Sequence, residues 1–209
     1  SGGLSTLAYR DAVPLASPRL CAAHCVWVDD EELAILATRG VNVMHCPGSN
    51  LKLGSGVAPV AEMRRRGITV SLGADGAACN NRLDMFEEMR LAALLQAMRR
   101  GPGSLPAHEV LWMATRAGAK TLGLDAIIGS VEPGKQADLI VVSRREPHVT
   151  PDPDPYGTLV YASRGADVRF TIVDGEVVVD GGVLVRLDRQ DVLQAAGEAA
   201  RELSSRAGV

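Results

Sequence analysis

The sequence predicts an α/β protein in which parallel β/α units are followed by an antiparallel β segment and a terminal helix. In the first part of the chain, short apolar runs alternate with amphipathic helical patterns over short links, which is typical of parallel β/α units. From about residue 130, the helical patterns give way to short β-type runs separated by hairpin-type turns such as Asp174-Gly175. The chain has 209 residues, enough for about one to one and a half domains.

Three short apolar runs in the first part each lead into a polar residue. They are 20–23 before His24, 41–44 before His45, and 68–72 before the glycine-flanked Asp75. Helices are expected between and after these runs, because acidic first turns and apolar residues at three-to-four spacing mark them. The first is expected to begin at Asp29 and stop at Gly40, and the others to span 57–66, 84–100 and 107–122.

The second part of the chain has the pattern of an antiparallel sheet. Its β-type runs are expected at 138–143, 158–162, 168–173, 176–179 and 183–185. Asp174-Gly175 and Gly181-Gly182 are expected to form the tight turns between them. The last helix is expected over 190–206, where apolar residues follow a helical spacing.

Composition places the chain among globular proteins, with 46% hydrophobic and 22% charged residues. The net charge of -3 gives no electrostatic case for nucleic acid or an anionic membrane as a partner. The start lacks the basic and apolar regions of a signal peptide, and no stretch reaches the roughly 18 apolar residues of a membrane span. We therefore expect a cytoplasmic protein. The four cysteines form no pair of CxxC motifs, which favours reduced thiols over a zinc knuckle.

The polar residues at the predicted strand ends are the candidates for chemistry. In a β/α barrel the active site lies at the carboxyl ends of the strands, so we expect His24, His45 and Asp75 to lie together. Imidazole binds first-row metals or transfers protons, and a carboxylate can bind a metal and accept a proton from water. Each histidine can instead be a buried, hydrogen-bonded structural residue, and Asp75 can instead cap the helix at 84–100 or serve in a turn.

Four segments resemble motifs of the methylthioadenosine/S-adenosylhomocysteine deaminase and chlorohydrolase family of the amidohydrolase superfamily. They are 23–32, with Ala-His-Cys-Val-Trp, 45–56, with His-Cys-Pro-Gly-Ser-Asn-Leu-Lys, 72–90, with Leu-Gly-Ala-Asp-Gly, and 129–139. The resemblance implies that residues 1–128 are the C-terminal portion of a (β/α)8 barrel of the TIM type, strands 6–8. It also implies that residues 129–209 are part of a small antiparallel β-sandwich plus a C-terminal helix.

The same resemblance implies a metal-dependent hydrolytic deaminase, an aminohydrolase acting on a C–N bond of a purine nucleoside-like or other heteroaromatic substrate. In the family, the position of Asp75 is a metal ligand that takes a proton from the attacking water, and the position of His24 helps to orient that water. One divalent metal is implied: zinc, with iron as the alternative, because histidine and carboxylate suit both. His45 matches a family motif without a role that we can assign.

Two family motifs do not occur in the 209 residues: a His-x-His pair of the first strand and a His-x-x-Glu of the fifth. Because three strands cannot close a barrel, we expect this chain alone to be inactive. We expect it to form a homo-oligomer or to associate with the missing N-terminal half. Two alternatives stay open: a triazine-type chlorohydrolase or N-alkylaminohydrolase, and a non-catalytic fragment that needs a complementary chain.

Overall fold

The computed structural model describes residues 15–208, which form a mixed α/β protein with two compact units. The first unit comprises the described residues up to Lys135 together with 144–167. The second comprises 136–143 and the residues from Val168 onward. The division predicted from the sequence, at residue 128, differs from these units, because the chain leaves the second unit after one strand and returns to the first at 144–167.

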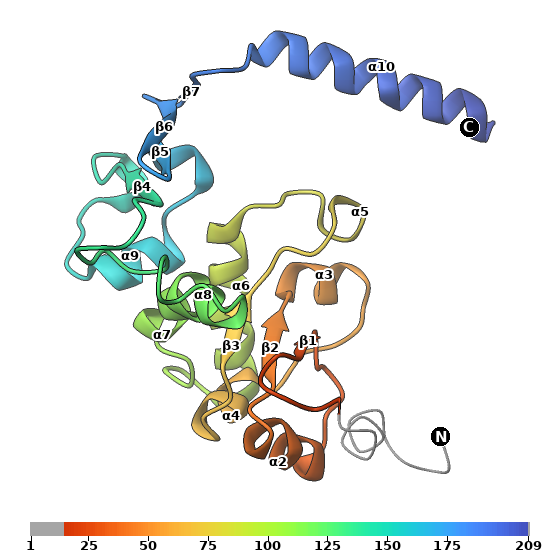
Figure 1. The fold of residues 1–209 in the computed structure, drawn as a ribbon, viewed down its shortest axis with the longest axis vertical. Helices are drawn as coiled ribbons and strands as arrows, with labels where there is room; N and C mark the ends of the chain where they lie inside the picture. Colours follow the sequence, from red (N-terminus) through yellow and green to blue (C-terminus); the bar gives the residue numbers. More distant parts are fainter. Residues whose placement is uncertain (1–14, 209) are drawn as a thin grey trace. The chain divides into compact units, whose positions relative to one another are not determined.

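The first unit is built on a parallel sheet of three strands in the order β1-β2-β3 (Figure 1). The strands are β1 (Cys21–Ala23), β2 (Asn42–His45) and β3 (Val70–Leu72). Cys21 pairs with Asn42, and Val43 with Val70. Val43 and Val70 have 0% exposure, because helices cover the sheet and an apolar strand gains most when it is fully buried. The predicted parallel arrangement of these three runs is confirmed.

Three helices lie between these strands, and two of them correspond to predicted helices. Helix α2 (Asp30–Thr38) begins at Asp29, whose side chain accepts from the backbone of Glu32 at 2.8 Å while Glu32 accepts from the backbone of Asp29 at 3.2 Å. This capping box satisfies two backbone groups that a helix start otherwise leaves unpaired. Helix α4 (Val60–Arg65) is shorter than the predicted 57–66, because Pro59 is its N-cap.

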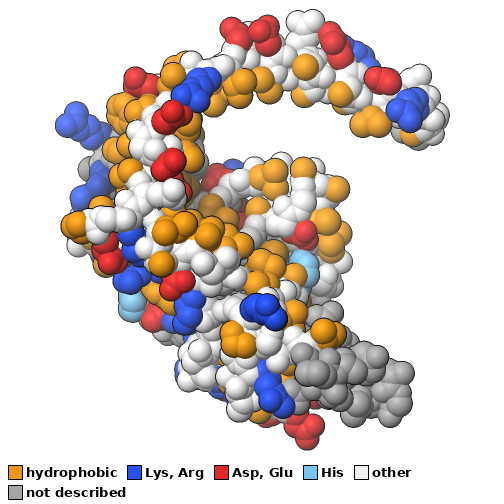
Figure 2. Space-filling view, viewed as in Figure 1, with side chains coloured by type: hydrophobic (Ala, Val, Ile, Leu, Met, Phe, Trp, Pro, Cys, Tyr) orange, Lys and Arg blue, Asp and Glu red, His pale blue; other side chains and the backbone are white. Residues whose placement is uncertain are grey.

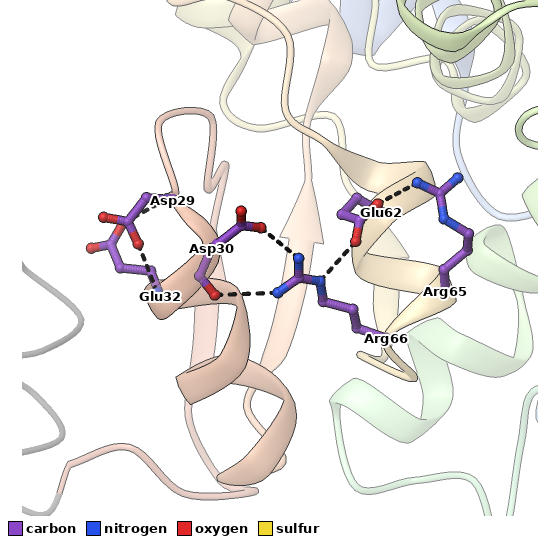
Figure 3. Close-up of polar contacts among 6 residues, drawn as sticks. All are labelled: Asp29, Asp30, Glu32, Glu62, Arg65 and Arg66. Atoms are coloured by element: carbon purple, nitrogen blue, oxygen red, sulfur yellow. Dashed lines mark hydrogen bonds and ion pairs between the residues drawn. The ribbon is translucent and has the colours of Figure 1, made fainter.

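A surface ion network joins α2 to α4, as Figure 3 shows. Arg66 donates to Glu62 at 2.7 Å and to the backbone carbonyl of Asp30 at 3.2 Å, and it pairs with the Asp30 carboxylate. Hydrogen bonds from Arg66 and Arg65 lower the pKa of Glu62 to about 2. Asp30 is 87% exposed, so solvent screens the network and it adds little to stability. The network is a structural feature of the helix pair.

The remaining helices of the first unit agree with the predictions in part. Helix α6 (Met85–Arg100) matches the expected 84–100. The expected single helix at 107–122 is interrupted at Thr115, whose φ of -126° and ψ of -89° are not helical, so it forms α7 (Ala107–Ala114) and α8 (Arg116–Thr121). Two short helices that the sequence pattern does not predict follow strands β2 and β3: α3 (Pro47–Lys52) and α5 (Ala77–Asn80).

The predicted β run at 158–162 is wrong, because α9 (Pro155–Tyr161) occupies this segment between the single turns η1 (Pro147–Val149) and η2 (Gly165–Asp167). Asp154 accepts from the backbone of Tyr156 and of Gly157 at 3.1 Å each, and Pro155 stands at the first helical position. An Asp N-cap followed by proline is a strong helix start, and it outweighs the β-type composition of the five residues.

The second unit is an antiparallel sheet in the order β4-β5-β6-β7 followed by a helix. Its strands are β4 (Leu139–Val142), β5 (Val168–Val173), β6 (Glu176–Asp180) and β7 (Val183–Leu184). The predicted hairpin turn between β5 and β6 is confirmed: Asp174 and Gly175 have φ of 50° and 82°, the left-handed values that such a turn needs.

Helix α10 (Arg189–Ala207) confirms the predicted last helix. Hydrophobic side chains lie along one side of it and charged side chains along the other (Figure 2). It buries none of its residues among those described; Leu203, for example, is 63% exposed. In residues 15–208, no helix combines the length and the apolar character that crossing a membrane requires.

Candidate metal-binding and catalytic site

Three polar residues named from the sequence lie at the carboxyl ends of adjacent parallel strands. His24 directly follows β1, His45 is the last residue of β2, and Asp75 lies in the loop after β3. The Nε2 atom of His24 is 3.7 Å from the Oδ2 atom of Asp75, and the two side chains are 39% and 32% exposed. The predicted approach of His24 and Asp75 is therefore confirmed as geometry, with both groups accessible at the same end of the sheet.

The backbone is bent into left-handed conformations at both residues. His24 has φ of 66°, Cys25 of 45° and Asp75 of 61°. A left-handed conformation costs about 1–3 kcal/mol at a residue with a side chain, so the surrounding structure must hold it. Such residues cluster at functional sites, where the bend directs a side chain that a regular strand end would turn elsewhere.

Hydrogen bonds hold both oxygens of the Asp75 carboxylate. The Ser49 hydroxyl donates to Oδ2 at 2.7 Å, and the backbone N–H of Gly76 donates to Oδ1 at 2.8 Å. The Ser49 hydrogen bond lowers the pKa of Asp75 most, followed by the Gly76 hydrogen bond, with smaller effects of His24 and Cys79. The carboxylate is therefore ionised at neutral pH and can accept a proton or bind a cation.

The alternative role of Asp75 as a helix cap is wrong. The N-cap of α6 is Asp84, which accepts from the backbone of Phe86 at 2.9 Å. The N-cap of α5 is Gly76, without a side-chain hydrogen bond. No helix start in the described structure depends on Asp75, so its carboxylate is left for the partners at the strand ends.

His24 is oriented by a buried amide. Its Nδ1 atom lies 2.8 Å from the Oδ1 atom of Asn50, which is 2% exposed. Because a carbonyl oxygen only accepts, Nδ1 carries the proton, and Nε2 is the nitrogen that faces Asp75. Nε2 of His24 and Oδ2 of Asp75 therefore face the same space, where a bound cation would contact both atoms.

His45 differs from His24 in its exposure and in its hydrogen bonds. Its side chain has 0% exposure, and neither ring nitrogen has a hydrogen-bond partner among the described residues. Burial, with a smaller repulsion from His24, lowers the pKa of His45 to about 4, so the ring is neutral at physiological pH. The structure places His45 at the expected strand end, as a buried residue without the hydrogen bonds of a typical structural histidine.

The residues present fit one part of a metal site. Asp75 offers a carboxylate oxygen and His24 a nitrogen lone pair on the same side of the sheet. Catalytic zinc takes three protein ligands plus an open position. Within residues 15–208, no group of three or more His, Cys, Asp or Glu side chains is placed to hold a metal. The remaining ligands would therefore have to come from outside the described residues.

Sequence reasoning did not identify Ser49 and Asn50, which contact Asp75 and His24 directly. Both lie in the 45–56 motif, so their presence in a recognised segment was the available signal. Cys79 contributes a hydrogen bond that lowers the pKa of Asp75. Its signal was its position four residues after Asp75 in the 72–90 motif.

The family model of the amidohydrolase family matches residues 4–178, and the chain belongs to this family. A 5'-deoxyadenosine deaminase of Methanothermobacter thermautotrophicus is 48% identical over 205 residues, which cover 98% of this chain and 48% of that protein. A 5-methylthioadenosine/S-adenosylhomocysteine deaminase of Moorella thermoacetica is 48% identical over 191 residues, which cover 91% of this chain and 45% of that protein. The resemblance inferred from the motifs is thereby confirmed.

A solved structure supports the same relationship. The crystal structure of an adenosine deaminase from Xanthomonas campestris with bound zinc matches with a TM-score of 0.95 at 35% sequence identity, over 97% of this chain and 46% of that one. The chain spans about half the length of the curated relatives it matches.

Proposed function

We propose that this chain is the C-terminal part of a metal-dependent hydrolytic deaminase that acts on a purine nucleoside-like substrate. Strands β1, β2 and β3 would be strands 6, 7 and 8 of an eight-stranded barrel, and residues 129–209 a β-sandwich segment with a helix. The observation that carries the proposal is the 3.7 Å approach of His24 Nε2 to Asp75 Oδ2 at the carboxyl ends of parallel strands.

In this proposal Asp75 has two roles. Its ionised carboxylate is a metal ligand, and it accepts the proton of the water that attacks the ring carbon bearing the amine. A divalent metal, zinc or alternatively iron, would supply the positive charge that makes this water a nucleophile at neutral pH. The hydrogen bonds from Ser49 and Gly76 keep the carboxylate ionised and fixed for both roles.

His24 orients the attacking water. Its Nδ1 atom is held by Asn50, so the ring presents Nε2 to the space beside Asp75. An imidazole fixed at one nitrogen can hold a water through the other, which places the water close to the carboxylate that takes its proton. The proton on the ring nitrogen of the substrate would come from a residue outside this chain, namely the glutamate of the His-x-x-Glu motif.

A purine nucleoside-like substrate is favoured because the relatives named above are deaminases of 5'-deoxyadenosine, 5-methylthioadenosine/S-adenosylhomocysteine and adenosine. The triazine-type hydrolase remains the alternative within the same chemistry, since it uses the same attack on a heteroaromatic ring. An N-terminal half is the proposed partner, because it would supply the missing strands and metal ligands.

The test is to purify the 209-residue chain alone and together with an N-terminal half, and to measure zinc content and ammonia release. The substrates are 5'-deoxyadenosine, methylthioadenosine, S-adenosylhomocysteine and adenosine, with a chlorotriazine as the comparison. We expect ammonia release, with about one zinc per active site, only when both halves are present. Chloride release from the triazine alone would favour the alternative. Inactivity of the combined halves would leave a non-catalytic module.

A further inference from the structure

We infer that helix α3 is a positioning element for this site, in which Ser49 fixes Asp75, Asn50 fixes His24, and the buried Glu88 fixes the helix itself. This inference rests on the proposed function, because it concerns how the two polar side chains are held for reaction. It gives roles to three residues that do not themselves belong to the proposed set of catalytic groups.

Consecutive residues of α3 contact the ends of two different strands. Ser49 donates to Asp75, after β3, at 2.7 Å, and Asn50 accepts from His24, after β1, at 2.8 Å. Ser49 has 0% exposure and Asn50 2%, so both contacts are made by buried side chains of α3. Because one rigid helical turn makes both contacts, it holds His24 and Asp75 at a fixed distance from each other.

The Ser49 contact determines the orientation of the Asp75 carboxylate. The Gly76 N–H holds Oδ1, and without Ser49 only this contact and the weaker hydrogen bond of the Cys79 thiol would hold the carboxylate, so it could turn. With Oδ2 also held, the plane of the carboxylate is fixed. The lone pairs that remain on both oxygens then point in defined directions, which a metal ligand and a proton acceptor both require.

Helix α3 is held in place by a residue of helix α6, which is distant in the sequence and adjacent in space. Its N-cap residue, Cys46, makes no side-chain capping hydrogen bond. Instead, the carboxylate of Glu88, which is 1% exposed, accepts from the backbone N–H of Gly48 at 2.9 Å and from Asn80 Nδ2 at 2.7 Å. Glu88 thereby ties α3, after β2, to α5, after β3.

Position 48 shows how closely the backbone of helix α3 approaches Glu88 of helix α6. A Cβ atom at Gly48 would lie 2.3 Å from Oε1 of Glu88 and 2.8 Å from Nδ2 of Asn80, well inside any real contact. Only glycine fits there without moving the carboxylate. The segment is therefore built so that a buried carboxylate reaches the backbone of the helix that carries Ser49 and Asn50.

The main test is Ser49→Ala in the active enzyme that carries this chain, with Ser71→Ala as the matched control. Ser71 is also buried, and its hydroxyl donates to the Val43 carbonyl at 3.3 Å. We expect Ser49→Ala to lower kcat and zinc affinity about 10- to 100-fold, the usual effect of losing a residue that orients a metal ligand. KM should change less than about twofold, and Ser71→Ala should leave kcat, KM and zinc affinity within about twofold. Equal effects of the two variants on kcat, or a kcat of Ser49→Ala within about threefold of the parent, would overturn the inference.

A second pair of variants covers the case in which Ser49→Ala does not fold. Asn50→Ala removes the acceptor for His24, and its control Asn42→Ala removes a buried amide that donates to the Pro18 carbonyl at 2.8 Å. We expect a loss of kcat about tenfold greater in Asn50→Ala than in Asn42→Ala. Equal losses in both would show that α3 is merely structural.

Crystal structures of the same variants separate this inference from the proposed function. We expect the Asp75 carboxylate to turn away from its present position in Ser49→Ala and to keep it in Ser71→Ala. If the parent enzyme neither bound zinc nor released ammonia, the proposed function would fail, yet the orientation of Asp75 would still be measured. An unmoved carboxylate in Ser49→Ala would overturn the inference whatever the activity.

Discussion

Two loops of this protein contain the same Asp-Gly dipeptide with the aspartate in a left-handed conformation, and the two dipeptides have different roles. Asp174 has φ of 50° and is followed by Gly175 with φ of 82°, and together they close the hairpin between β5 and β6. Asp75 has φ of 61°, but Gly76 has φ of -75° and leads away from a parallel strand. The fold around each dipeptide therefore decides its role.

The two aspartates also differ in the contacts that they make. At the hairpin, the described hydrogen bond of Asp174 is made by its backbone N–H, which donates to the Asp138 carboxylate at 2.7 Å. At the strand end, the carboxylate of Asp75 accepts from Ser49 and Gly76 and faces His24. A left-handed aspartate in a hairpin satisfies the geometry of the turn, whereas one beyond a parallel strand presents its carboxylate where strand ends meet.

The largest expected effect is on activity, from Asp75→Asn compared with Asp174→Asn in the active enzyme. Asparagine keeps the shape and tolerates the left-handed conformation, but it lacks the charge and the basicity of the carboxylate. We expect kcat of Asp75→Asn to fall about 10²- to 10⁴-fold together with zinc content, and Asp174→Asn to stay within about twofold. Steady-state kinetics and metal analysis make the comparison. Equal kcat values for the two variants would remove the distinction between the two loops.

The next effect is on stability as a function of pH, through His45. Its pKa is lowered from 6.5 to about 4 in the folded protein, mainly by burial. Between these pH values the unfolded chain binds a proton that the folded protein does not, so the free energy of unfolding falls as the pH falls, by up to about 1.4 kcal/mol per pH unit.

Urea unfolding from pH 7 to pH 4 measures this slope. We expect His45→Leu to flatten it between pH 6.5 and 4, and Asp174→Asn to leave it as in the parent. The same slope in His45→Leu as in the parent would show that other groups titrate in this range.

The smallest expected effect is the difference in stability between alanine variants of the two glycines. Gly175→Ala places a Cβ at a positive φ of 82°, which costs about 1–2 kcal/mol of the free energy of unfolding. Gly76→Ala meets no heavy atom within 4 Å and has an ordinary φ of -75°, so we expect a change below about 0.5 kcal/mol. Urea midpoints at constant m-value give both numbers. A larger loss in Gly76→Ala would mean that the Asp75 loop needs its glycine for conformational reasons.

The sequence predicts the polar ends of the first-unit strands, because the periodicity of apolar residues and the turn signals are local. His24 and Asp75 could be named in this way, and their motifs strengthened the interpretation. Ser49 lies in a recognised motif, but its role could not be named, because its hydrogen bond to Asp75 joins residues 26 apart in the sequence. The prediction for segment 158–162 is wrong for a local reason. Its composition favours a strand, whereas Asp154 and Pro155 just before it start a helix.

The proposal that Asp75 contributes a metal ligand from this chain can be tested by diffraction at the zinc absorption edge. Crystals of the active enzyme that carries this chain would be measured on both sides of the edge. We expect an anomalous peak about 2.0–2.2 Å from a carboxylate oxygen of Asp75, the ordinary zinc–carboxylate distance, on the side that faces His24. A fully occupied zinc elsewhere in the enzyme, with Asp75 bound only to Ser49 and Gly76, would contradict it.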